Sequence, residues 1–157
     1  MKLFLTLAFA AVSLWAAVNP QLKQVNTVYI LAMGGGMDQF LANQLTARGV
    51  FQVVADPQQA DAIITDKIGE PFQSKLDELY ASPANDNKSS DISGTARVSS
   101  LGRGKGNLFI VDRKTRAVLW SIYQPPKDSS ADTLSRTAAK VVKRLKDDLI
   151  EKKQSGQ

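Results

Sequence analysis

The stretch "VYILAMGGGMDQFLANQL" (Val28–Leu45) joins an apolar run, three glycines and an amphipathic run. This outline of a strand, a tight turn and a helix predicts the start of a parallel βαβ unit. Glycine adopts the backbone conformations of a sharp bend more readily than any other residue, so Gly34, Gly35 and Gly36 are expected to be structural. The same outline also occurs where proteins hold phosphates, and this leaves a nucleotide site as an alternative.

A dinucleotide site in this turn would need Gly-x-Gly-x-x-Gly and an acidic residue after the second strand. Gly34 and Gly36 fit the pattern and Asp56 stands at the acidic position, but Gln39 replaces the third glycine. Asp38 also places a carboxylate at the start of the helix, where a phosphate would have to lie. No Gly-Lys-Ser/Thr follows, which excludes a P-loop. The residues favour a turn without a cofactor, and a nucleotide-dependent enzyme is the alternative to test.

Outward from this stretch, the apolar pattern predicts further strands and helices. Expected strands cover residues 25–31, 50–54, 62–68 and 107–111, with a short one at 96–99 and a returning strand that Pro125-Pro126 ends. Expected helices cover residues 38–48, 70–80 and 130–152. The predicted fold class is therefore α/β (α+β), a mixed sheet of four or five strands with a βαβ start, a β-hairpin and a long C-terminal helix.

The segment "NLFIVDRKTRAVLWSIYQ" predicts the hairpin. Asp112 begins its polar turn, where an aspartate side chain can accept backbone N–H groups. On the returning strand, Val118, Trp120 and Ile122 alternate with other residues and are expected on one face. We expect Trp120 in the core, together with Leu145 of the helix that follows.

The last predicted helix carries one apolar stripe at spacings of three and four residues. The stripe consists of Leu134, Ala138, Val141, Val142, Leu145 and Leu149. Ser129 and Asp132 resemble a capping box at the start of the helix. The pattern predicts a helix that lies along one face of the sheet and turns its charged side to solvent.

The N-terminal residues have the order of a secretory signal: Lys2, an apolar run over 3–12, then Ala16 and Ala17. The apolar run is shorter than the roughly 20 residues of a membrane span, and no cysteine follows for a lipid anchor. We predict a signal peptide at 1–16, a linker at 17–24, a single domain at 25–153 and a tail at 154–157. The protein is expected in the bacterial periplasm or outside the cell, with no transmembrane span after cleavage.

The sequence contains no cysteine and no histidine, and its formal net charge is +5. A thiol nucleophile, a zinc–thiolate site and histidine-based acid–base catalysis are therefore excluded. An enzyme would have to work with carboxylates, lysine or tyrosine. Positive and negative residues are interspersed, which is typical of a solvated surface. We predict that the protein is not an enzyme and has no cofactor or metal.

Residues 81–106 are rich in Ser, Asn, Asp and Gly and predict a flexible loop. Arg97, Arg103 and Lys105 lie in this loop among glycines and form a candidate anion-binding site for an anionic polymer. A solvated loop is the other interpretation. No aromatic residue separates these cations, whereas nucleic-acid platforms usually have one, so no nucleic-acid partner is expected.

Three segments together resemble a group of small bacterial envelope α/β domains: "GVFQVVADPQQADAIIT", "LFIVDRKTRAVLWS" and "AAKVVKRLKDDL". The group includes the curli-secretion channel protein, the penicillin-binding-protein activator lipoproteins and the amino-terminal domain of TolB. Many members carry a lipidated cysteine that is absent here, and glycine often stands where this chain has Arg116. The resemblance implies a non-enzymatic domain that binds another envelope component, a protein or part of the cell wall. It carries over no catalytic residue.

Overall fold

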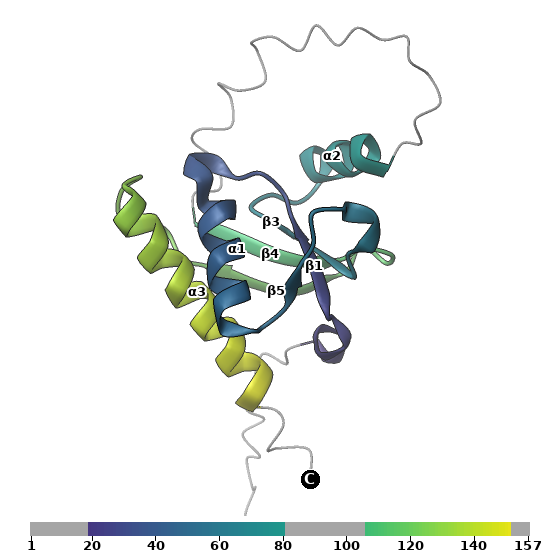
Figure 1. Cartoon of the computed structure of the whole chain (residues 1–157). Helices are drawn as coiled ribbons and strands as arrows, with labels where there is room; N and C mark the ends of the chain where they lie inside the picture. The colour runs from purple at the N-terminus through teal and green to yellow at the C-terminus, as the bar shows by residue number, and fades with distance from the viewer. Residues whose placement is uncertain (1–18, 81–105, 152–157) are drawn as a thin grey trace, which may run out of the picture.

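The computed structural model describes residues 19–80 and 106–151 of the chain, coloured along the sequence in Figure 1. Some predictions fall on residues outside these ranges. They are the signal peptide at 1–16, the loop from 81 to 105 with Arg97, Arg103 and Lys105, the strand at 96–99 and the tail at 154–157.

One mixed five-stranded sheet has the strand order β2-β1-β3-β4-β5. Its strands are β1 (Thr27–Ile30), β2 (Gln52–Val53), β3 (Ala62–Thr65), β4 (Asn107–Asp112) and β5 (Val118–Tyr123). Strand β1 is parallel to both β2 and β3, whereas β4 is antiparallel to β3 and to β5. The predicted fold class, the βαβ start and the hairpin are confirmed.

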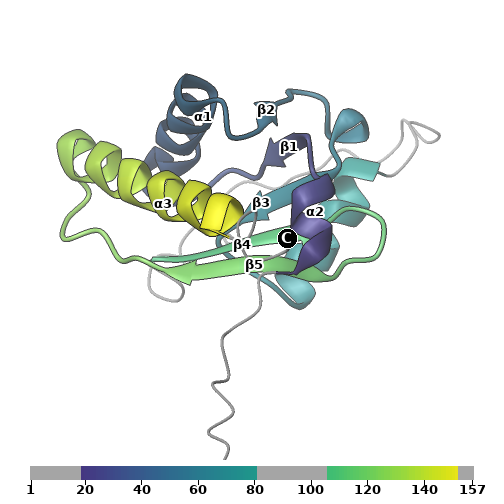
Figure 2. The same cartoon turned by 90° about the horizontal axis from the view of Figure 1, so that it is seen from below.

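Three α-helices of the described chain cover the sheet: α1 (Met37–Arg48), α2 (Glu70–Tyr80) and α3 (Ala131–Glu151). Figures 1 and 2 show α1 and α3 together on one face and α2 on the other. Strand β3 is buried on both faces, because Ile64 packs with the α1 and α3 side and Ile63 packs with the α2 side. This explains why its sequence is apolar at every position up to Thr65.

The glycine turn has the bend that its sequence predicts. Gly35 and Gly36 have φ values of +70° and +78°, which side chains other than glycine rarely adopt. The backbone N–H of Met33 donates to Asp38 Oδ1 at 3.2 Å, so the first helical turn is tied back to the end of the strand segment. The turn thereby sends α1 back over the sheet.

The hairpin turn contains the predicted aspartate contacts. Asp112 Oδ1 accepts the backbone N–H groups of Lys114 at 3.0 Å and of Thr115 at 2.6 Å. Arg116 has a φ of +62° and is the one residue other than glycine with positive φ among those described. Arginine thus occupies a backbone conformation here that glycine adopts without strain.

The prediction that Val118, Trp120 and Ile122 share one face is wrong at its first member. Trp120 pairs with Ile110, but Val118 pairs with Val111, so the register shifts by one residue between them. This β-bulge turns Val118 away from Trp120, because each added residue reverses the face. Val118 is 43% exposed, whereas Trp120 is 7% exposed and lies in the core as expected.

Helix α3 buries the predicted apolar stripe, including Leu145, against the sheet and α1. Its cap lies one residue later than the sequence pattern indicates. The N–H of Thr133 donates to Ser130 Oγ at 3.3 Å, while Ser130 N–H donates to Asp128 Oδ1 at 2.8 Å. The capping box at Ser129 is therefore wrong, because the helix begins after Ser130.

The described part of the predicted linker is ordered. Residues Pro20–Gln24 form a turn of 3-10 helix, which begins with the N–H of Gln21 donating to Asn19 Oδ1 at 3.0 Å. Leu22 in this turn is completely buried in the same core as α1 and α3. The folded domain therefore begins before the predicted boundary at Val25.

Candidate functional site

Strand β5 forms an edge of the sheet, and half of its backbone groups face away from β4. Gln124 N–H donates to the carbonyl oxygen of Gly106, which fixes Gln124 as a hydrogen-bonded position of this antiparallel pair. Hydrogen-bonded positions alternate along such a pair, so Ser121 and Tyr123 direct their N–H and C=O groups outward. Tyr123 is also 67% exposed.

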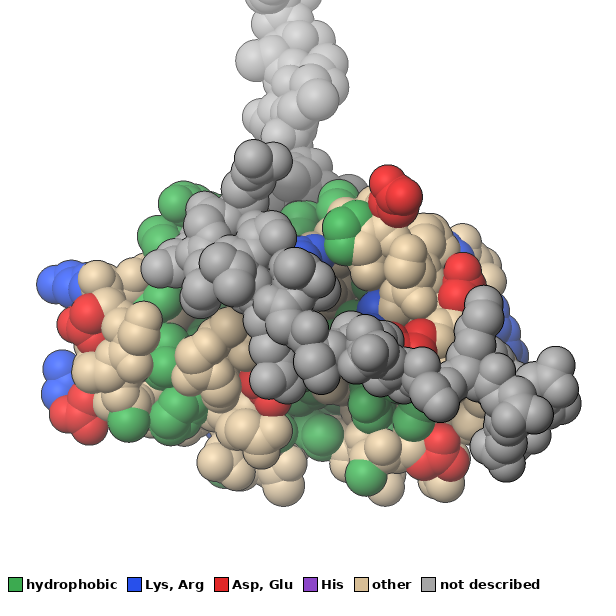
Figure 3. Space-filling model, turned by 90° about the horizontal axis from the view of Figure 1, so that it is seen from above, with side chains coloured by type: hydrophobic (Ala, Val, Ile, Leu, Met, Phe, Trp, Pro, Cys, Tyr) green, Lys and Arg blue, Asp and Glu red, His purple; other side chains and the backbone are tan. Residues whose placement is uncertain are grey.

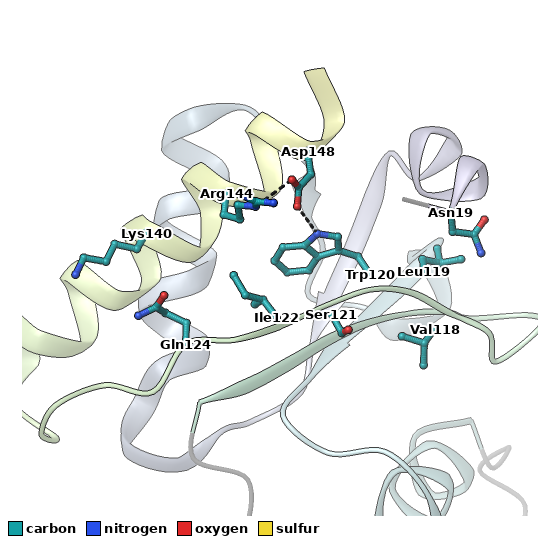
Figure 4. A pocket seen from close by; sticks show the side chains of 10 residues that line it. All are labelled: Asn19, Val118, Leu119, Trp120, Ser121, Ile122, Gln124, Lys140, Arg144 and Asp148. Carbon is teal, nitrogen blue, oxygen red and sulfur yellow. Dashed lines mark hydrogen bonds and ion pairs between the residues drawn. The ribbon is translucent and has the colours of Figure 1, made fainter. Parts of the chain in front are cut away.

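A groove of about 790 Å³ runs along this edge and is called the β5 groove (Figure 4). It is lined by residues 118–122 and Gln124 of the edge, by Lys140, Arg144 and Asp148 of α3, and by Asn19. The groove thus combines outward-facing strand backbone with one polar helix face.

Trp120 forms the apolar wall of the β5 groove and is fixed in place by a hydrogen bond. Its Nε1–H donates to Asp148 Oδ2 at 2.9 Å, and Arg144 Nε lies 3.0 Å from Asp148 Oδ1. Both carboxylate oxygens of Asp148 are therefore engaged. Figure 4 shows the indole ring held in this way between β5 and the end of α3.

Lys140 supplies the positive charge of the β5 groove that lacks an internal partner. Its side chain is exposed, and it forms no ion pair with any residue of the described ranges. Arg144 is already paired with Asp148. A negatively charged group that enters the groove would thus meet Lys140 without breaking an existing contact.

The second candidate, the glycine turn, brings acidic groups together. Burial raises the pKa of the Asp66 carboxyl, and the neighbouring Asp38 carboxylate contributes to the rise. In Figure 3, which looks from above onto the top of Figure 1, basic and acidic side chains alternate and form no continuous basic patch on the described surface in view. An incoming phosphate would thus meet the Asp38 and Asp66 carboxyl groups near the turn, with Lys67 as the nearby positive charge.

Asp56, the residue predicted to hold a ribose in the alternative, has a local role. Its Oδ1 accepts the N–H of Gln58 at 2.9 Å and its Oδ2 accepts from Gln59 Nε2 at 3.1 Å, which caps the 3-10 turn Pro57–Gln59. Neither the β5 groove nor a second pocket, lined by residues 25–26, 46 and 49–53, includes Asp56 or the three glycines.

Within residues 19–80 and 106–151, no three acidic side chains are placed to hold a metal ion. The helices of these same ranges are too short or too polar to cross a membrane. The residues missed by sequence reasoning are Lys140, Arg144 and Asp148. The spacing of Arg144 and Asp148 by four residues indicates an ion pair on a helix, but nothing in the sequence relates Asp148 to Trp120.

Comparisons with protein-family models, with curated proteins and with solved structures find no match for this chain. The resemblance to small envelope domains, which rests on three short segments, accordingly stays a prediction. Among the described residues, the β5 groove and the outward-facing backbone of β5 are the features best suited to bind another molecule.

Proposed function

We propose that this protein is a non-enzymatic accessory module of the bacterial cell envelope that binds another envelope protein. The partner contributes an extended segment, which adds to the sheet as a sixth strand beside β5. The observation that carries the proposal is the outward-facing backbone of β5 next to the β5 groove. The signal segment predicted at 1–16 supports the envelope as the place where this happens.

Strand addition suits this edge because the main-chain groups provide most of the contacts. An added strand would bond to the outward N–H and C=O groups of Ser121 and Tyr123, while pockets beside the strand select side chains. Strand β5 has six residues, enough for a segment of ordinary strand length. Natural proteins usually shorten or cover such edges, since a free edge recruits other chains.

The side chains of the β5 groove define the chemistry of the segment. Trp120 offers an apolar wall with little freedom to move, because Asp148 holds its indole N–H. Lys140 offers a positive charge without an internal partner. We therefore expect an extended segment with an apolar side chain over Trp120 and an acidic side chain opposite Lys140.

The non-enzymatic part of the proposal is supported by the missing cysteine and histidine and by the acidic surroundings of the glycine turn. The nucleotide alternative predicts heat of binding when the protein is titrated with NAD, ATP or GTP. We expect a flat calorimetric trace at millimolar nucleotide. A saturable signal that Gly35→Val removes would support the enzyme instead.

The partner is tested by placing a photo-reactive amino acid in the full-length protein at Val118, which lines the β5 groove. The same probe at Ile68, 48% exposed and outside the groove, is the matched control. We expect Val118 to cross-link, in intact cells, to an extended and acidic segment of another exported protein. Mass spectrometry of the cross-linked peptide identifies that segment.

The charge requirement is tested by Lys140→Glu, with Lys146→Glu as the control on the same helix. Both variants change the net charge equally, but only Lys140 lines the groove. The cross-link from Val118 should fall with Lys140→Glu alone. Cross-links to a second copy or to other residues of the same chain, or equal capture from Ile68, would contradict the proposal, as would retention of the mature protein in the cytoplasm.

A further inference from the structure

The turn between β4 and β5 carries two arginines, Arg113 and Arg116, whose guanidinium groups lack an oxygen acceptor among the described residues. Neither Arg113 nor Arg116 forms a side-chain hydrogen bond or an ion pair with a described residue. The Nε of Arg113 and one terminal nitrogen of Arg116 (Nη1) are shielded from solvent and still lack an acceptor. A shielded donor without an acceptor is costly, and an oxygen acceptor from a bound ligand would satisfy it.

Both arginines lie against the same aromatic ring. The guanidinium carbons of Arg113 and Arg116 are 6.0 Å and 5.8 Å from the centre of the Tyr80 ring. The ring itself is fixed, because its hydroxyl donates to the carbonyl oxygen of Pro57 at 2.8 Å. A ring face attracts the positive charge but gives the N–H groups no oxygen acceptor, so their hydrogen-bonding capacity remains open.

The acidic residues near the pair are engaged with backbone groups. Asp61 Oδ2 accepts the N–H groups of Asn26 at 3.0 Å and of Thr27 at 2.9 Å. Asp112 Oδ1 accepts those of Lys114 and Thr115. These carboxylates therefore bond to the backbone and to the turn, and neither forms an ion pair with the two guanidinium groups, although the Arg113 charge helps to lower the pKa of Asp61.

The backbone at Arg116 adds an independent observation. With a φ of +62°, this position suits glycine, and a side chain here strains the main chain. Strain of this kind persists where the residue serves a purpose that the surrounding structure maintains. Glycine could form this turn without strain. A role of the arginine side chain therefore explains why the strained conformation is kept.

We propose that Arg113 and Arg116 bind a phosphate group or a similar tetrahedral oxyanion at this turn. Guanidinium groups donate pairs of parallel hydrogen bonds to such oxygens, and the two arginines together supply donors and positive charge for the non-bridging oxygens of a phosphate. The Tyr80 ring keeps both guanidinium groups close together at the turn. The phosphate can be free in solution or be part of a lipid headgroup, since both present the same oxygens.

The site is tested by nuclear magnetic resonance of the arginine Nε–H groups in the full-length protein, at constant ionic strength. Addition of inorganic phosphate should shift the Arg113 and Arg116 signals in a saturable way. Phosphatidylglycerol vesicles, compared with phosphatidylcholine vesicles, distinguish a lipid source: a shift only with the anionic vesicles assigns the phosphate to the headgroup. No shift with phosphate or with vesicles overturns the proposal.

Arg116→Gly separates binding from folding. Glycine relaxes the backbone at φ +62°, so the variant should melt at a higher temperature than the natural protein while its phosphate affinity falls at least tenfold. Lys114→Gln is the matched control, because it removes one positive charge from the same turn. Unchanged affinity in Arg116→Gly, or an equal loss in Lys114→Gln, contradicts the specific site.

Discussion

Strand β2 closes one edge of the sheet with two residues, whereas β5 closes the other edge with six. The hydrogen bonds of β2 to β1 run from Gln52 N–H to Asn26 and from Val54 N–H to Val28, so Val53 alone turns its N–H outward. On β5, Ser121 and Tyr123 both do so, beside a groove in which Lys140 forms no ion pair with a described residue. A short edge gives an incoming chain little to bond to. Among the described residues, the sheet therefore protects its β2 edge and leaves its β5 edge open.

The largest expected effect is a loss of stability where β5, the open edge, packs against α3. Trp120→Ala removes a buried ring from between β5 and α3 and should destabilise the protein by about 3–5 kcal/mol. Urea unfolding measures this loss. Trp120→Phe, which keeps a ring but not the N–H, should cost about 1 kcal/mol. A loss below about 1 kcal/mol for the alanine variant would mean that β5 is held to α3 by other contacts.

The next prediction compares how much each of the two edges contributes to partner binding. Ser121→Pro and Val53→Pro each remove one outward N–H and leave the ladder to the neighbouring strand intact. Only Ser121→Pro should weaken partner binding, by about tenfold or about 1.4 kcal/mol, because the added strand loses a bond and meets the proline ring.

Partner affinity in this comparison is measured with the segment that the Val118 cross-link identifies. Ser121→Ala, which retains the N–H, is the control and should bind normally. If Val53→Pro weakened binding as much as Ser121→Pro, the contrast between the edges would not hold.

A smaller effect concerns the protected edge. The hydrogen bonds from Thr27 and Asn26 N–H hold the pKa of Asp61 below its usual value of 3.8, despite some burial that acts in the opposite direction. A lowered folded pKa stabilises the protein above pH 3.8 and loses this effect as the pH falls through the folded value. Asp61→Ala should therefore cost about 1 kcal/mol at pH 7 and much less near pH 2.

Hydrogen exchange shows which edge of the sheet is destabilised in Asp61→Ala. Asn26 accepts the N–H of Gln52, so freeing the start of β1 should speed exchange of the Gln52 amide more than that of the Trp120 amide. Equal acceleration at both edges would show that Asp61 supports the whole sheet rather than the β2 side.

The smallest effect concerns Asp66, which directly follows the central strand β3. Burial raises the pKa of Asp66, so the folded protein is less stable when this group is charged. Stability should accordingly increase as the pH falls through the raised folded pKa. Asp66→Asn should stabilise the protein by less than about 1 kcal/mol at pH 7, because the group is partly solvated, and by almost nothing below pH 3. Thermal unfolding at both pH values checks this.

Sequence patterns predict most of the helices and turns, because these depend on interactions between residues close in the sequence. The stripe of α3, the helix at Glu70–Tyr80 and the Asp112 turn each follow from residues close in sequence. Strand β3 ends at Thr65, earlier than predicted, because the Thr65 hydroxyl bonds with the backbone of Lys67 and turns the chain toward α2. Such side-chain turns interrupt an apolar pattern without altering its composition.

The candidate site could not be predicted in the same way. Alternation along a strand gives its faces but not its place in the sheet, so the open edge at β5 appears only once the strand order is known. The Trp120–Asp148 contact joins residues 28 positions apart. The bulge before Trp120 adds one residue to the pairing and leaves no mark in the apolar pattern.

The two-residue length of β2 has a consequence for self-assembly. Open-ended fibres need subunits that accept a strand on one side and offer an equal one on the other. If two copies of this chain paired through their β5 strands, the long edge strand of each would be occupied. Only the short β2 edges of the sheets would remain, so assembly would end at the dimer. For strand addition the protein has a valence of one, which limits polymerisation.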